Sequence, residues 1–255
     1  MKALVRRPGP RLGEGIVTHL ERRPVDVDLA HAQWSAYVTA LEEAGWETVE
    51  APPADESPDG VFVEDAVVVY EHVAVVARPG VESRRSETVG VEAALAELGY
   101  AVERIEEPGT LDGGDVLKIR DTVHVGLSGR TNAEGARQLR ELLAPLGATV
   151  VEVPVEGVLH LKSAVTALPD GSILGHPPLV PEAFRREFVV VSEVSGAHVV
   201  LLRGGKVMLA ADCPRTAELV AARGYDPVVV DISEFQKREG CVTCLSVRLR
   251  RAAYA

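Results

Sequence analysis

The chain of 255 residues is long enough for one large domain or two small ones, and 46% of its residues are hydrophobic, which can fill a substantial core. Its formal net charge of −11 disfavours nucleic acid and anionic membranes as partners, because both are polyanions held mainly by clusters of Lys and Arg. No apolar run reaches membrane-spanning length, and residues 1–8 do not resemble a signal peptide. Three cysteines, an odd number, do not predict a disulfide scaffold, so we expect a cytoplasmic protein.

A repeated pattern, in which a helix-like stretch ends at a glycine and a β-rich run follows, organises the chain. The four stop glycines are Gly45, Gly99, Gly147 and Gly224. The gap before the last one has room for another, degenerate unit around residues 181–191, which makes five units. Because each unit mixes strands with one helix and no domain-sized linker interrupts them, we predict a single α/β domain over residues 1–255.

The first helix is predicted by apolar residues at three- and four-residue spacing, with Asp28 as its N-cap and Gly45 as its left-handed stop. These apolar residues are Trp34, Tyr37, Val38 and Leu41. Strands are expected at Ala66–Tyr70, Val73–Ala77, Val116–Ile119, Val123–Val125, His198–Leu202 and Lys206–Ala210. Residues 203–205, between the last two runs, predict a hairpin turn.

Unusual polar residues recur at equivalent places in the repeat. Asp65, Asp112 and His160 are 47 and 48 residues apart, which is one unit each, and Cys244 follows the last stop glycine. If the units are arranged around an axis, equivalent positions meet on that axis. The repeat therefore predicts that carboxylates, an imidazole and a thiol come together at one place.

Cys244 has several possible roles when it is considered alone. A free cysteine is often just a small buried hydrophobic residue, and this is the interpretation we prefer for Cys213. Cys241 and Cys244 form a C-x-x-C motif, but a zinc site would need about two further ligands and none is evident. Thioredoxin-type chemistry places such a motif at the start of a helix, whereas residues 245–249 predict a strand. For Cys244 two roles stay open, that of a small buried hydrophobic residue and that of a nucleophile.

A nucleophilic thiol needs a nearby base or cation, because at its ordinary pKa only a few per cent is thiolate at neutral pH. His160 can serve, although its apolar surroundings also fit a core histidine. The acidic runs at residues 59–65 and 110–115 suit a guanidinium, whose N–H groups carboxylates accept in pairs. Asp115 and the charges of residues 103–107 are expected to be solvated.

Arg84 and Arg130 each precede a predicted helix, so surface solvation or helix capping would explain them. An amino-acid substrate offers another role, because an arginine can bind an α-carboxylate through two hydrogen bonds. Neither the phosphate-loop motif nor the dinucleotide-binding motif is present, so no nucleotide cofactor is implied.

Seven short motifs follow one another along nearly the whole chain. They are Phe62-Val63-Glu64-Asp65, Arg78-Pro79-Gly80, Ser83-Arg84-Arg85, Leu111-Asp112-Gly113-Gly114-Asp115, residues 130–135, Leu159-His160-Leu161-Lys162 and Cys244-Leu245-Ser246. Together they resemble the dimethylarginine dimethylaminohydrolase family. The resemblance implies the pentein fold, a five-bladed α/β propeller. It also implies hydrolysis of asymmetric dimethylarginine or monomethylarginine to citrulline and an amine, without metal or cofactor.

The resemblance also implies roles for individual residues. Catalytic roles fall to Cys244 as nucleophile, His160 as general acid and base, and Asp112 and Asp65 as groups that position the guanidinium. Substrate-binding roles fall to Arg84 and Arg130 at the α-carboxylate, Asp59 and the Ile16 backbone near the α-amine, and Glu64 and Phe62 beside the carboxylates. Residues 13–19 look like a lid over the substrate. The expected partners are a small methylated arginine and, in a homodimer, a second copy of the chain.

Three alternatives stay open. Arginine deiminases and amidinotransferases share the fold and the nucleophile, but they usually carry Asp two residues after the histidine, where this chain has Lys162. The fold also occurs in a ribosome anti-association factor that performs no such chemistry. That non-catalytic alternative predicts loss of the cysteine and the histidine, and both are present here.

Overall fold

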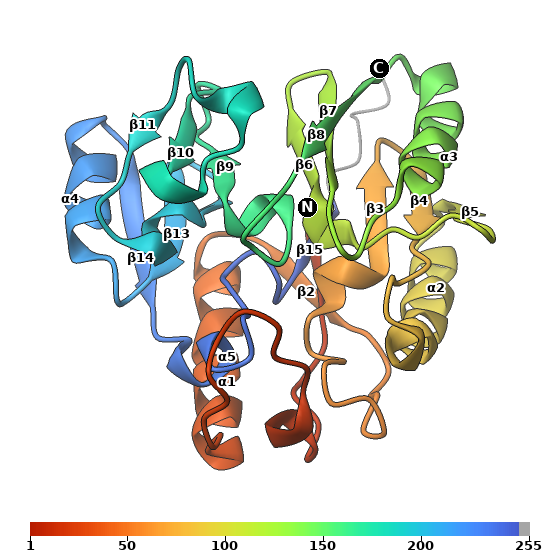
Figure 1. Cartoon of the computed structure of the whole chain (residues 1–255). Helices are drawn as coiled ribbons and strands as arrows, with labels where there is room; N and C mark the ends of the chain where they lie inside the picture. Colours follow the sequence, from red (N-terminus) through yellow and green to blue (C-terminus); the bar gives the residue numbers. More distant parts are fainter. Residues whose placement is uncertain (250–255) are drawn as a thin grey trace.

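The computed structural model describes residues 1–249, which form five three-stranded sheets around a common centre (Figure 1). Sheet by sheet, the strands are β15 (Val247–Leu249), β1 (Lys2–Val5) and β2 (Glu47–Glu50); β3 (Val67–Tyr70), β4 (Val73–Val76) and β5 (Ala101–Arg104); β6 (Val116–Ile119), β7 (Thr122–Leu127) and β8 (Thr149–Pro154); β9 (Val165–Ala167), β10 (Ile173–Gly175) and β11 (Val189–Val190); β12 (Val200–Leu201), β13 (Lys206–Ala210) and β14 (Asp226–Val230).

Every sheet has the same pairing: its middle strand runs antiparallel to the first strand and parallel to the third. The sheet that contains β1 takes its first strand from the other end of the chain, since β15 pairs with β1. This pairing closes the ring of five blades. The five units predicted from the repeat are therefore confirmed, and so is the five-bladed α/β propeller that the family resemblance implies.

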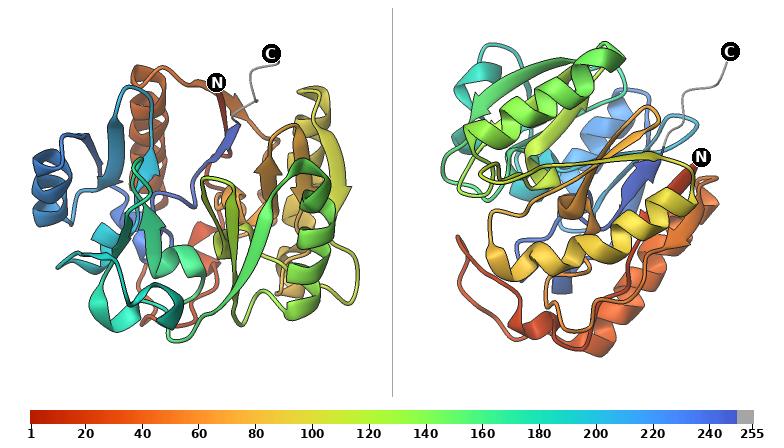
Figure 2. Two further views of the ribbon diagram at one scale, coloured as in Figure 1. Left: turned by 90° about the horizontal axis from the view of Figure 1, so that it is seen from above. Right: turned by 90° about the vertical axis from the view of Figure 1, so that its right-hand side faces the viewer.

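The four longer helices pack on the outer sides of the sheets, and a fifth, short helix packs against the first (Figures 1 and 2). They are α1 (Val27–Glu43), α2 (Thr88–Glu97), α3 (Ala133–Leu143), α4 (Pro214–Ala222) and the short α5 (Ser233–Gln236). All four predicted stop glycines have the positive φ angles, +79° to +85°, that a left-handed helix end requires. The fifth unit also exists as β9–β11, but short 3-10 turns replace its helix.

One helix boundary was predicted wrongly. The N-cap of α1 is Asp26, whose side chain accepts a hydrogen bond from the Leu29 backbone N–H at 3.0 Å, while Asp28 lies inside the first turn. Both aspartates suit a helix start because a carboxylate there interacts favourably with the helix dipole. Spacing alone does not distinguish the capping residue from one in the first turn.

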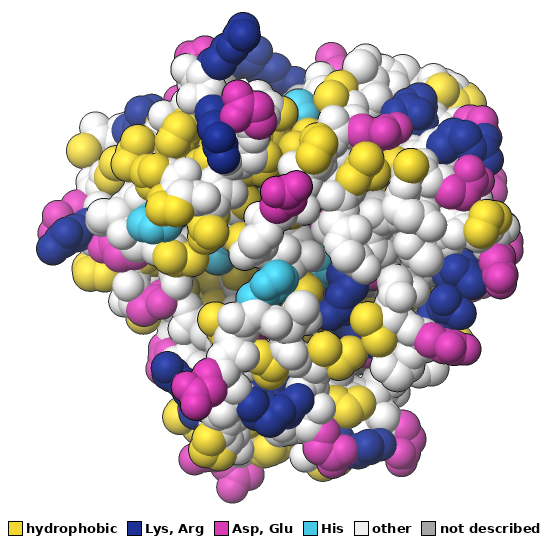
Figure 3. Space-filling model, in the orientation of Figure 1, with side chains coloured by type: hydrophobic (Ala, Val, Ile, Leu, Met, Phe, Trp, Pro, Cys, Tyr) yellow, Lys and Arg dark blue, Asp and Glu magenta, His cyan; other side chains and the backbone are white. Residues whose placement is uncertain are grey.

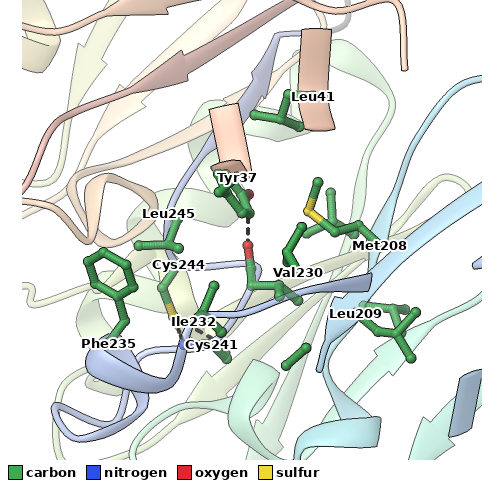
Figure 4. Packing of buried hydrophobic residues seen from close by; sticks show 14 of the residues in the cluster. Tyr37, Leu41, Met208, Leu209, Val230, Ile232, Phe235, Cys241, Cys244 and Leu245 are labelled. Carbon is green, nitrogen blue, oxygen red and sulfur yellow. Dashed lines mark hydrogen bonds between the residues drawn. The ribbon is translucent and has the colours of Figure 1, made fainter. Parts of the chain in front are cut away.

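The largest hydrophobic cluster joins α1 to the blade β12–β14 and to the segment before β15. Tyr37 of α1 is fully buried in it and donates its hydroxyl to the Val242 carbonyl at 2.8 Å (Figure 4). Charged side chains of both signs surround the outline of the face in Figure 3, with hydrophobic side chains between them. Within residues 1–249, no helix is long and apolar enough to cross a membrane.

The first strands of all five blades surround a central channel. A cavity of about 500 Å³ occupies one end of this channel. Its wall includes one or more residues from each first strand, among them Val67, Val116, Thr166, Leu201 and Val247. The turns that precede these strands therefore lie together at the other end of the channel, and they carry the polar residues singled out by the repeat.

Candidate active site

Three of the five turns bring their polar residues into direct contact. Asp65 lies in the 3-10 turn Val63–Ala66, Asp112 directly precedes the turn Gly113–Asp115, and His160 directly precedes the turn Leu161–Ser163. His160 Nε2 is 3.1 Å from Asp112 Oδ2, and His160 Nδ1 is 3.8 Å from Asp65 Oδ1. All three side chains are buried. The convergence predicted from the repeat is confirmed for these two carboxylates and the imidazole.

Glycine makes this close approach possible. A Cβ atom on Gly113 would lie 2.0 Å from the Glu64 carbonyl oxygen, and one on Gly114 would lie 2.5 Å from His160 Nδ1. The Gly114 N–H donates to Asp65 Oδ1 at 3.1 Å. A larger residue at either position would push the turns apart, so the Gly-Gly pair sets the distance between the carboxylates and the imidazole.

The protonation of His160 follows from this environment. Burial lowers the pKa of its imidazolium, but the charge of Asp65, the hydrogen bond to Asp112 and the charge of Asp115 outweigh that effect and raise the pKa to about 9. Burial also raises the pKa of Asp65, and the charges of His160 and Arg84 more than reverse this, so the net change is a lowering. At neutral pH the site therefore holds an imidazolium beside ionised Asp65.

Cys244 lies in a turn closed by a 3.0 Å hydrogen bond from its backbone N–H to the Cys241 carbonyl. Its sulfur accepts from the Cys241 N–H at 3.4 Å and lies 3.2 Å from the Cys241 sulfur. The hydrogen bond to Cys241, burial, and the charges of Asp65 and Glu64 raise the pKa of the Cys244 thiol well above its usual range. Without a cation at the site, this thiol is protonated.

Arg84 is buried and holds the carboxylates in place. Its Nη1 donates to Asp65 Oδ2 at 2.8 Å, and its Nε and Nη2 donate to Glu87, the latter at 2.8 Å. Nη2 also points to the Asp59 carbonyl at 3.4 Å. These contacts occupy four of the five N–H donors of the guanidinium. Surface solvation is thus wrong as an explanation of Arg84.

Arg130 is buried as well, but its guanidinium makes fewer hydrogen bonds than that of Arg84. Nη2 reaches Thr18 Oγ1 at 3.3 Å, and Nη1 has no hydrogen-bond partner among residues 1–249, with Asp112 Oδ2 at 3.7 Å. Helix capping does not explain it, since Asn132 is the N-cap of α3. A buried charged donor without a partner is costly, so this side chain is suited to receive an anionic group.

The loop at residues 13–19 lies against the site through backbone hydrogen bonds. The Ile16 N–H donates to both Asp59 carboxylate oxygens, at 3.0 and 3.2 Å, and the Thr18 and His19 N–H groups donate to Glu239. Burial raises the pKa of Asp59. The structure thus brings together Asp59 and Ile16, both of which were assigned to the α-amine side.

Glu64 and Phe62, the two other predicted substrate-binding residues, each contact a neighbouring side chain. Glu64 Oε1 is 2.5 Å from Lys162 Nζ, while its Oε2 has no hydrogen-bond partner within residues 1–249. Burial raises the pKa of Glu64 despite the opposing charges of Lys162 and Arg248. Phe62 packs edge-to-face against Phe235, with ring centroids 6.5 Å apart. The Glu64–Lys162 pair lines the central cavity and belongs to the turns that carry Asp65 and follow His160.

Asp115 was predicted wrongly as a solvated residue. It is fully buried, accepts from the hydroxyls of Ser128 and Thr131 at 2.6 and 2.7 Å, and accepts from the Leu161 N–H at 2.9 Å. Asp115 therefore ties the turn that follows His160 to the turn that follows Asp112. Nothing in the acidic run separates it from a surface aspartate, because its partners are 13 to 46 residues away.

Sequence reasoning also missed Glu87 as a neighbour of a functional residue. Glu87 has no distinguishing motif, although its three-residue spacing from Arg84 is typical of an ion pair on one turn.

Asp65, Asp112 and His160 have ligand atoms within 4.8 Å of one another, as a metal site would. These groups already pair with one another and with Arg84, so the cluster favours a hydrogen-bonding cation over a bare ion.

A five-bladed α/β propeller that gathers a cysteine, a histidine and carboxylates at one end of its channel defines the pentein class of guanidine-modifying enzymes. No protein-family model matches the chain. It is 65% identical over 98% of its length to the N(G),N(G)-dimethylarginine dimethylaminohydrolase of Streptomyces coelicolor, of which it covers 97%. It is 36% identical over 96% of its length to the Pseudomonas aeruginosa enzyme, of which it covers 98%. The chain belongs to the dimethylarginine dimethylaminohydrolase family.

Solved structures agree. A Pseudomonas aeruginosa dimethylarginine dimethylaminohydrolase, a cysteine-to-serine mutant complexed with citrulline, matches with a TM-score of 0.91 and 35% identity, over 97% of this chain and 98% of that one. A histidine-to-glycine dimethylarginine dimethylaminohydrolase adduct with S-methyl-L-thiocitrulline gives a TM-score of 0.91 at 34% identity, over 97% and 99% of the two chains. The N-terminal domain of ArgZ, at 20% identity and a TM-score of 0.86 over 98% of both chains, shares the fold.

Proposed function

We propose that this protein hydrolyses asymmetric dimethylarginine and monomethylarginine to citrulline and dimethylamine or methylamine, through a covalent thiouronium intermediate on Cys244. The observation that carries the proposal is the contact of Asp65, Asp112 and His160 at the ends of three equivalent turns, with Cys244 in a fourth. Its relatives of 65% and 36% identity, named for this reaction, support it, as do the citrulline complex and the thiocitrulline adduct of similar enzymes.

Substrate binding activates the nucleophile in this mechanism. In the free site Cys244 is a thiol, because its hydrogen bond with Cys241, its burial and the charges of Asp65 and Glu64 raise its pKa. A guanidinium that binds between the carboxylates brings a positive charge next to the sulfur. That charge lowers the pKa of the thiol, so the thiolate forms where its target carbon is bound.

The thiolate then attacks the guanidinium carbon, which gives a tetrahedral adduct. His160, protonated in the resting site, donates its proton to the departing amine as the carbon–nitrogen bond breaks. The neutral imidazole next removes a proton from water, and the hydroxide attacks the thiouronium carbon. The carbon–sulfur bond breaks, which releases citrulline and regenerates Cys244. Asp112 orients the imidazole and Asp65 accepts from the guanidinium.

The two arginines divide the work at the amino-acid end of the substrate. Arg130, whose Nη1 has no hydrogen-bond partner in the described part of the chain, binds the α-carboxylate, and Arg84 contributes at most one remaining N–H while it holds Asp65 in position. Asp59 binds the α-amine together with the Ile16 backbone of the lid. Phe62 and Glu64 complete the site beside the carboxylates.

The preference for a methylated guanidinium rests on Lys162. Deiminase relatives carry a carboxylate at this place that accepts from an unsubstituted nitrogen, whereas here Lys162 pairs with Glu64. A dimethylated nitrogen has no proton to donate and would leave such an acceptor unpaired, at a cost of roughly 1 to 3 kcal/mol. The absence of a carboxylate at position 162 therefore favours asymmetric dimethylarginine and monomethylarginine over arginine. Symmetric dimethylarginine is rejected because one methyl group must face Asp65 or Asp112.

Matched kcat/KM measurements on asymmetric dimethylarginine, monomethylarginine, symmetric dimethylarginine and arginine test the proposal. The first two should release citrulline efficiently and the last two poorly. If arginine is turned over as well as asymmetric dimethylarginine, the protein is a deiminase-type sibling instead. The cytoplasmic location, the homodimer, the single domain and the absence of nucleic-acid partners stay predictions.

A further inference from the structure

The mechanism leaves one nucleophilic group unused, the thiol of Cys241. Its sulfur lies 3.2 Å from the Cys244 sulfur, and the hydrogen bond from the Cys244 N–H to the Cys241 carbonyl closes a tight turn between them. Such a turn holds its end Cα atoms within about 7 Å, and a disulfide needs Cα atoms about 4.4 to 6.8 Å apart. The sulfurs need to approach by only about 1.2 Å to reach the bonding distance.

The pair lies at the edge of the large hydrophobic cluster, beside Phe235 and Leu245 (Figure 4). Cys241 and Cys244 are 5% and 6% exposed. The Cys241 sulfur is also 3.2 Å from Thr243 Oγ1. The hydrogen bond from Cys244 and the charge of His198 outweigh burial and lower the pKa of Cys241, so a thiolate forms more readily on this pair than on an isolated buried thiol.

We propose that Cys241 and Cys244 form a modification site at which hydroperoxides produce an intramolecular disulfide that reversibly removes the catalytic nucleophile. One sulfur attacks the hydroperoxide and becomes a sulfenic acid, as the O–O bond breaks and an alcohol or water leaves. The second sulfur then attacks the first and expels water, which forms the S–S bond. Each cycle consumes one hydroperoxide and two thiols, and a dithiol reverses it.

The third cysteine provides an internal control. Cys213 is fully buried at the start of α4, and its sulfur hydrogen-bonds to the Ala210 carbonyl at 2.9 Å. Burial and the charge of Asp212 raise its pKa to about 12. It lies in a different blade from the pair, so it should be neither oxidised nor able to resolve a sulfenic acid on Cys244.

The test is hydrogen peroxide treatment of the full chain, with intact mass, peptide mapping and citrulline release measured on the same samples. Wild type and Cys213→Ser should lose the mass of two hydrogen atoms in a peptide that joins residues 241 and 244. Activity should fall by roughly tenfold or more, and dithiothreitol should restore it. In Cys241→Ser, each sample normalised to its own untreated rate, Cys244 should gain oxygen atoms, and dithiothreitol should not restore activity.

Addition of two or three oxygens to Cys244 in wild type without a disulfide would overturn the proposal, as would a disulfide to Cys213. If Cys241→Ser does not fold, Cys241→Ala replaces it, and the mass of the peroxide-treated wild type still shows whether the disulfide forms. The inference that oxidation silences the enzyme rests on the proposed role of Cys244. A disulfide that forms without loss of citrulline release would refute that role and leave the modification site intact.

Discussion

Two neighbouring blades, β9–β11 and β12–β14, show which part of the repeat carries function. The first lacks an α-helix between its last two strands, yet the turn that leads into it carries His160. The second keeps the helix α4, but its equivalent turn, Val194–Ala197, contributes none of the proposed catalytic groups. Chemistry in this fold therefore depends on the turn before the first strand, while the helix supports packing.

The turn Val194–Ala197 has a structural role, because its contacts hold the start of α4 against the blade. A Cβ on Gly196 would lie 2.1 Å from Thr216 Oγ1, and Glu193 accepts from the Arg215 N–H at 2.9 Å at the start of α4. Ser195 donates to Asp212 at 2.7 Å. These contacts fasten the helix to the blade. The comparison predicts that substitutions at catalytic turns affect turnover and that substitutions at this turn affect stability.

The largest effect is expected for Cys244→Ser. Turnover of asymmetric dimethylarginine should fall by about a thousandfold or more, because an alkoxide is far harder to generate than a thiolate. Steady-state kinetics of citrulline release measure the effect, with Cys213→Ser as the matched control. Labelling by an alkylating amidine should modify the peptide that contains Cys244, and labelling mainly at Cys241 would contradict the assignment.

His160 should make stability depend on pH. Its folded-state pKa, raised to about 9, lies above the unfolded value of 6.5, so the folded protein binds more protons between these values. The resulting stabilisation, on the order of 3 kcal/mol, is fully present below the unfolded pKa and is lost as the pH rises through about 9. Denaturant unfolding of wild type and His160→Asn from pH 6 to 10 measures it. Curves that stay parallel over this range would argue against an imidazolium in the resting site.

Arg130→Ala should cost on the order of 1.5 to 3 kcal/mol in transition-state binding, as expected for hydrogen bonds to a charged group. The loss should appear in kcat/KM for asymmetric dimethylarginine. A methylated agmatine, which lacks the carboxylate, should show little further loss with this variant. An equal loss with both substrates would assign Arg130 to the guanidinium end or to the fold.

Ser195→Ala should have the smallest effect on catalysis. Its turn corresponds to the one that follows His160, but kcat/KM should stay within about twofold of wild type because the hydroxyl only ties Asp212 and Gln236 together. Thermal unfolding should show a loss of roughly 0.5 to 1.5 kcal/mol. A large loss of kcat with unchanged stability would mean that this blade also supplies the active site.

The sequence by itself determined the five-unit repeat, the ends of the helices at left-handed glycines, and the positions at which Asp65, Asp112 and His160 recur. These features can be recognised in the residue order, because a repeat is a regular spacing along the chain and a left-handed helix end depends on the conformational freedom of one glycine. The repeat also implied convergence, since equivalent positions around an axis must lie close together. The degenerate fifth unit was predicted for the same reason.

Only the tertiary structure decided which charged groups pair. Asp115 and Asp112 look alike in the acidic run, but one is hydrogen-bonded by Ser128, Thr131 and the Leu161 N–H, while the other meets His160. Arg84 and Arg130 likewise look alike, yet the first is hydrogen-bonded to Asp65 and Glu87, while Nη1 of the second has no hydrogen-bond partner among residues 1–249. The pKa of each group depends on burial and on charges from other blades, which the order of residues along the chain does not contain.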